Sequence, residues 1–155
     1  MVISALVAFG ATGIAYAAGN TVAITGSVTI NHYCAFTTNT AAIVFGGSTG
    51  LNPGSNTGTM ANTISVTDTG NLNSNILTSG TTWTFGSNTF GVSNTEYSAS
   101  AATSYGSGTA LSASSTDTNI PVNTVSANTI SYGLGVPNGQ APGTYTQTID
   151  VISSC

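Results

Sequence analysis

Hydrophobic and polar residues alternate with a period of two along much of the chain after residue 20. In the stretch TVAITGSVTI, residues 21–30, the apolar side chains of Val22, Ile24, Val28 and Ile30 share one face. Strict alternation of this kind is typical of a half-buried β-strand. The segment is therefore predicted to be extended, with one apolar face that needs a partner.

Similar short apolar stretches recur to the C-terminus, separated by segments rich in Gly, Pro, Asn and Ser. The predicted strands are 41–46, 62–67, 81–85, 108–111, 118–123, 128–134 and 143–152. Turn-forming residues at such close intervals, without a second helical period, indicate a fold that is mainly β. We expect an immunoglobulin-like β-sandwich of about eight strands, formed by residues 20–155.

The first 18 residues, MVISALVAFGATGIAYAA, follow a different pattern, because they carry no charge and are almost all apolar or small. As a helix they would span about 27 Å, close to the thickness of the hydrocarbon core of a bilayer. We expect residues 1–18 to form a hydrophobic helix that packs against copies of itself through small residues. The residues expected at this contact are Val2, Ile3, Leu6, Val7, Phe9, Gly10, Gly13 and Ile14.

This segment also has one feature of a cleaved secretory signal. Ala15 and Ala17 are small residues at the spacing that signal peptidases prefer, whereas the positive charges of a signal peptide are absent. We favour retention of the segment. Removal of residues 1–17 is the alternative, and it would leave residues 20–30 as an N-terminal strand.

The charge composition excludes several classes of function. The chain contains no Lys or Arg and only four acidic residues, so it cannot neutralise phosphates, and we expect no nucleic-acid partner. Thr and Ser supply most of the polar surface instead. Their hydroxyls are potential attachment points for O-linked glycans, whereas no asparagine stands in an N-glycosylation sequence.

The chain has two cysteines, Cys34 and the terminal Cys155. In an exported chain an even pair indicates a disulfide, which here would tie an early strand to the last residue. A free buried Cys34 with an intermolecular Cys155 is the alternative.

No residue pattern indicates catalysis, a metal site or a cofactor. His32 is the only histidine and lacks the further ligands that zinc requires. The acids Asp68, Glu96, Asp117 and Asp150 lie in separate predicted elements, so a carboxylate pair is not expected. Trp83 is expected in the core, and a sugar-stacking role is the alternative.

Parts of the sequence resemble secreted β-sandwich proteins of archaea and bacteria. The stretches that carry the resemblance are IVFGGSTGLNPG, NTISVTDTGNLNSNI and YGLGVPNGQAPGTYTQTIDV. Domains similar to spore coat protein U and to TasA/camelysin-type fibre proteins share parts of this pattern. The hydrophobic start followed by a sandwich with almost no charge resembles mature archaeal type IV pilins, although many of these lack cysteines and have a longer helix.

The resemblance implies a non-enzymatic structural subunit of an extracellular cell-surface filament, or pilus. Identical subunits would polymerise through a core of bundled helices, with membrane contact only before assembly. One alternative is a secreted fibre protein that loses residues 1–17 and donates the strand with Val22, Ile24, Val28 and Ile30 to a neighbour. The other is a surface or carbohydrate-binding module that uses Trp83.

Overall fold

The computed structural model describes residues 24–71, 75–100, 103–121 and 127–154. The chain divides after Ile30, and a compact unit begins at Asn31. The predicted helix at residues 1–18 lies outside the described residues, as does Val22. In the described part, every element except one short 3-10 helix, η1 (Val92–Asn94), is a β-strand. The prediction of a mainly β fold is confirmed.

Two sheets form the compact unit. The larger sheet has the order β1-β2-β9-β6-β7 and the smaller has the order β10-β3-β8, and every pairing is antiparallel. The strands of the larger sheet are β1 (Phe36–Thr38), β2 (Asn62–Asp68), β6 (Thr95–Ser98), β7 (Thr109–Ala110) and β9 (Ala127–Leu134). Those of the smaller sheet are β3 (Asn75–Gly80), β8 (Thr116–Pro121) and β10 (Ile149–Ser153), and a separate hairpin consists of β4 (Trp83–Phe85) and β5 (Asn88–Phe90).

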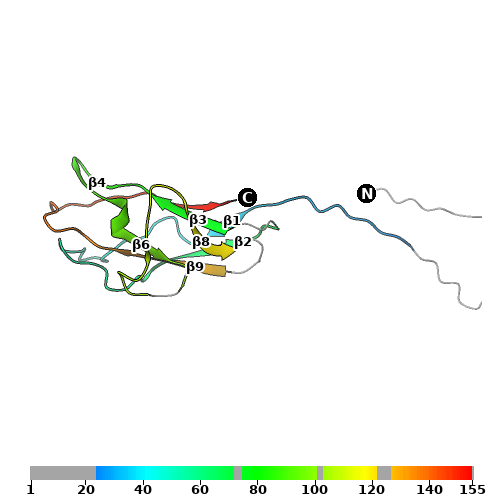
Figure 1. The fold of residues 1–155 in the computed structure, drawn as a ribbon, viewed down its shortest axis with the longest axis horizontal. Helices are drawn as coiled ribbons and strands as arrows, with labels where there is room; N and C mark the ends of the chain where they lie inside the picture. Colours follow the sequence, from blue (N-terminus) through cyan, green and yellow to red (C-terminus); the bar gives the residue numbers. More distant parts are fainter. Residues whose placement is uncertain (1–23, 72–74, 101–102, 122–126, 155) are drawn as a thin grey trace, which may run out of the picture. The chain divides into compact units, whose positions relative to one another are not determined.

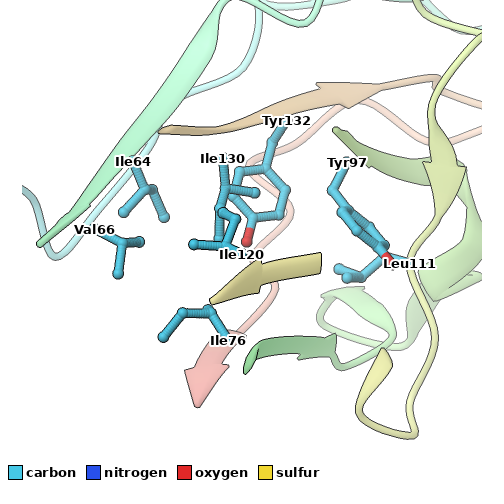
Figure 2. Close-up of a cluster of buried hydrophobic side chains, with 8 residues drawn as sticks. All are labelled: Ile64, Val66, Ile76, Tyr97, Leu111, Ile120, Ile130 and Tyr132. Carbon is cyan, nitrogen blue, oxygen red and sulfur yellow. The ribbon is translucent and has the colours of Figure 1, made fainter. Parts of the chain in front are cut away.

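The two sheets pack face to face, with β6 and β9 on one side and β3 and the C-terminal β10 on the other (Figure 1). Alternate residues of each sheet point inward and form the main core (Figure 2). The members of this core are Ile64, Val66, Ile76, Tyr97, Leu111, Ile120, Ile130 and Tyr132. The alternation seen in the sequence of β2 and β9 thus places their apolar residues in one shared interior.

A second, mainly aromatic cluster lies at the β4–β5 hairpin. Trp83 stacks on Phe90 with their ring centroids 5.6 Å apart, and Phe45 meets Trp83 edge-on at 5.7 Å. Only 7% of Trp83 is exposed, so it belongs to the core, as expected, and its ring faces are not open for stacking on a sugar.

Two predicted strands are absent from the described structure. Residues 41–46 form no strand, because they pass through turns and line a groove instead of pairing with a neighbour. Residues 24–30 pair with no described strand either. Their apolar side chains remain in solvent, with Ile24 88%, Val28 84% and Ile30 75% exposed.

Candidate functional site

The compact unit carries an apolar groove of about 1210 Å³. Phe36 of β1 lines it from the larger sheet, and Ile149 and Val151 of β10 line it from the smaller one. β1 and β10 are both edge strands. The groove therefore lies between the open edges of the two sheets, where one strand would fill the space.

One end of the groove is marked by the start of β1 and the end of β10. There the Sγ atom of Cys34 lies 2.8 Å from the Oγ atom of Ser153. The chain leading into β1 is held on the larger sheet, since the Tyr33 amide donates to the Asn71 side chain and the Asn71 side chain donates to the Asn31 carbonyl. Cys155 lies outside the described residues, so the predicted disulfide stays a prediction.

The other end of the groove is aromatic. Tyr145 lies 5.2 Å from Phe90 and 5.6 Å from Phe85, measured between ring centroids, and Trp83 and Phe45 complete the lining there. The hydroxyl of Tyr145 donates to the Ala141 carbonyl. The segment from Tyr145 to Ser153 thus runs along the groove from its aromatic end to its Cys34 end.

The backbone along this segment has one paired side and one open side. Thr146 exchanges two hydrogen bonds with Thr84, the Thr148 carbonyl accepts from the Thr81 amide, and the Ser154 amide donates to the Asn75 carbonyl. Because backbone groups alternate in direction along a strand, those of residues 147, 149 and 151 point to the opposite side. No described strand pairs with them there.

The side chains along this segment also alternate. Tyr145, Ile149 and Val151 are half-buried on the groove side, whereas Thr146, Thr148 and Asp150 are exposed. Asp150 is the only charged residue among those that line the groove. An apolar, uncharged chain therefore fits this surface better than a charged ligand would.

A buried polar network supports the aromatic end. The indole Nε1 of Trp83 donates to the Thr95 hydroxyl over 2.9 Å, and that hydroxyl donates to Gln147 Oε1 over 2.9 Å. The Gln147 side chain in turn donates to the Thr81 carbonyl. These bonds fix the open-edged segment against the hairpin without using its free backbone groups.

Two acidic residues, Asp117 and Glu96, accept local hydrogen bonds. Both oxygens of Asp117 accept hydrogen bonds, from the Asn75 side chain at 2.7 Å and the Asn119 amide at 2.6 Å. Glu96 accepts from the amides of Gly106 and Gly108. His32 is exposed, and the described residues contain no group of three His, Cys, Asp or Glu that could hold a metal.

No helix among the described residues is both long enough and apolar enough to span a bilayer. The chain matches no family model, no curated protein and no solved structure.

Sequence reasoning did not identify this groove. Ile24, Val28 and Ile30, which the sequence suggested for a donated strand, are exposed, and that role stays a prediction. The groove itself was missed, although the apolar face of residues 143–152 and the uncharged stretch 40–53 both contribute to it. The predicted helix residues, Val2 to Ile14, lie outside the described residues.

Proposed function

We propose that this chain is a structural subunit of an extracellular cell-surface filament. Its body would be an immunoglobulin-like β-sandwich that lacks one strand. Copies of the chain would join when the segment 22–30 of one copy enters the groove of another. No cofactor and no catalysis are part of this function.

The groove between β1 and β10 is the observation that carries the proposal. Its apolar lining is costly to leave in water, and the unpaired backbone edge at residues 147, 149 and 151 is a template on which another strand can pair. Edge strands that are not meant for pairing are usually protected. The edge strand β10 carries one exposed charge, at Asp150, but it contains no proline and its pairing with β3 shows no register shift.

The opposite side of the smaller sheet shows the contrast. β8 ends at Pro121, contains Asn119 with a φ of 60°, and pairs with β3 through a register shift at Ile76/Leu77. Proline, positive φ and bulges all discourage edge-to-edge pairing. On the larger sheet the corresponding edge strand, β7, has only two residues. Strand addition is therefore favoured on one side of the body only.

Residues 24–30 have the properties that the missing strand requires. They carry no charge, their apolar residues share one face, and the outward positions Thr25, Ser27 and Thr29 bear hydroxyls. The groove would bury Ile24, Val28 and Ile30, which are now more than 70% exposed. Full burial of such a side chain is worth about 1.5–3 kcal/mol.

The composition suits a filament outside the cell. A surface of hydroxyls and amides without Lys or Arg offers trypsin-like proteases no cleavage site. Its hydroxyls are potential attachment points for O-linked glycans. A filament core made of residues 1–18 stays a prediction, because those residues lie outside the described part. The two modes of assembly differ in which N-terminal segment joins the copies.

The test is electron microscopy of the purified chain with two matched pairs of substitutions. We expect fibres from the unmodified protein, and none from the Ile24→Asp/Val28→Asp variant, because two carboxylates would have to enter an apolar groove. The control Ser27→Asp/Thr29→Asp adds the same charge on the outward face and should still form fibres. Fibres from both variants would show that this segment is not the joint. An unmodified protein that stays dispersed would overturn the filament proposal.

A further inference from the structure

We infer that the inserted segment comes from a second copy of the chain and runs antiparallel to β10, with Ile30 at the aromatic end of the groove and Ile24 at the Cys34 end. This inference rests on the proposed function and adds the direction and the register of the inserted segment. In this register Ile24 lies opposite Val151, Val28 opposite Gln147 and Ile30 opposite Tyr145.

The pairing pattern favours the antiparallel direction. Every strand pair among the described residues is antiparallel, and antiparallel pairing is slightly more stable per residue than parallel pairing. The backbone groups of residues 147, 149 and 151 point to the open edge. The backbone groups of Gln147 would exchange hydrogen bonds with those of Val28, and the backbone groups of Val151 with those of Ile24. The side chains of Val28 and Ile24 would then face the core.

The register follows from comparing residues 22–30 with residues 145–153, both in their alternation of side chains and in their length. The apolar positions from 22 to 30 are even-numbered, and the inward positions from 145 to 153 are odd-numbered. Both segments would extend over about 25–30 Å at 3.3 Å per residue. With their ends aligned, the outward residues also match, since Ser27 lies opposite Thr148 and Thr29 opposite Thr146. Cross-strand pairs of Thr and Ser are favourable in sheets.

The antiparallel direction requires a second molecule. Asn31 is held near the Cys34 end of its own body by the hydrogen bond from Asn71. An antiparallel segment places Ile30 at the opposite end, about 25 Å away along the strand. Consecutive Cα atoms are only about 3.8 Å apart, so a chain cannot fill its own groove in this direction.

The arrangement also makes the assembly linear and polar. The body of the donor molecule would lie next to the aromatic end of the acceptor's groove. The acceptor's own N-terminal segment would leave from the Cys34 end. Donor and acceptor surfaces are different, so the contact is heterologous, and it continues as an open filament when the rotation between copies does not close a ring. In a parallel insertion, the donor's body and the acceptor's own N-terminal segment would instead both lie at the Cys34 end.

Two double-cysteine variants test the direction and the partner together. Thr29→Cys/Thr146→Cys places the two thiols opposite each other in the antiparallel register, at a non-hydrogen-bonded position where side chains are closest. Thr29→Cys/Asp150→Cys is the matched variant for the parallel direction. All three positions are exposed. Each variant is oxidised under filament-forming conditions beside the unmodified chain and run on a non-reducing gel.

We expect a ladder of covalent multimers from Thr29→Cys/Thr146→Cys, and only the background of the unmodified chain from the other variant. A ladder from Thr29→Cys/Asp150→Cys alone would overturn the direction. An internally bridged monomer would overturn the second copy as the partner. Fibres without a ladder from either variant would overturn the register while leaving the filament intact, whereas the absence of fibres from the unmodified chain would overturn the proposed function itself.

Discussion

The sulfur of Cys34 lies 2.8 Å from the hydroxyl oxygen of Ser153, across a sequence separation of 119 residues. This contact joins the chain leading into β1 to the last residue of β10. The two edge strands that line the groove, β1 and β10, are therefore close together at this end. Residue 155, the predicted disulfide partner, follows Ser153 by two positions.

Removing the predicted disulfide should destabilise the body strongly. The bridge would close a loop of about 120 residues, which corresponds to about 4–5 kcal/mol in the chain-entropy model. We expect Cys34→Ser/Cys155→Ser to lower the free energy of unfolding in urea by several kcal/mol. Reductant should weaken the unmodified chain equally and leave the variant unchanged. Equal stability of both chains with and without reductant would contradict the bridge.

Thr95 should be required for stability because it satisfies Trp83. The hydroxyl is fully buried, accepts from the indole and donates to Gln147. Thr95→Val keeps the shape but leaves a buried donor and an acceptor unpaired, which costs about 1–3 kcal/mol. The matched control is Thr63→Val, whose side chain is exposed and whose effect should be near zero. Urea unfolding followed by Trp83 fluorescence measures both, and equal effects would contradict the network's role.

Strands of both sheets could be predicted from the sequence, since 62–67, 108–111 and 128–134 match β2, β7 and β9 and 118–123 and 143–152 overlap β8 and β10, whereas β1, β3 and β6 were missed. β2 and β9 alternate apolar and polar residues, so their inward faces are visible in the sequence alone. β3 was missed because buried hydroxyls interrupt its pattern. Thr78 is fully buried, yet it donates to the Asp150 carbonyl and lies 2.9 Å from the Tyr132 hydroxyl. A polar residue that finds its partners only after folding gives no hydrophobic signal.

Only some of the residues discussed for the candidate site could be identified from the sequence, for a related reason. Residues 41–46 are apolar, and an apolar run does not reveal whether it will pair as a strand or line a groove. Val44 is 69% exposed, which no local pattern indicates. A groove between two sheet edges depends on which strand is missing, and this is a property of the topology. The alternation at Ile24, Val28 and Ile30, by contrast, is local and was readable.

Alkaline pH should weaken the fold through Tyr132. Burial raises the pKa of Tyr132 to about 12, although its hydrogen bond with Thr78 acts in the opposite direction. An unfolded tyrosine has a pKa of about 10. The neutral hydroxyl is therefore favoured in the fold, and this contribution is complete below pH 10 and is lost as the pH rises from 10 to 12, by about 2–3 kcal/mol.

Denaturant unfolding between pH 8 and pH 12 checks this dependence. The unmodified chain should lose stability above pH 10, and Tyr132→Phe should show a smaller loss because the ionising group is gone. Tyr33→Phe removes a hydroxyl that is largely exposed and serves as the control, with the same pH dependence as the unmodified chain. A Tyr132→Phe variant with an unchanged alkaline slope would contradict the assignment.

Gly46 should determine the shape of the groove wall. Its φ is +75°, and an added Cβ would lie 2.6 Å from the backbone carbon of Gly50. The neighbouring Gly47 has a φ of +59° but open space around the same position. Both substitutions to alanine carry the strain of a left-handed backbone, about 1–2 kcal/mol, but only Gly46→Ala also forces two backbone segments apart. We expect Gly46→Ala to lower the free energy of unfolding more than Gly47→Ala and to reduce filament formation, as measured by urea unfolding and electron microscopy. If the two variants behaved alike, the close approach of Gly46 to Gly50 would have no role in holding the wall of the groove.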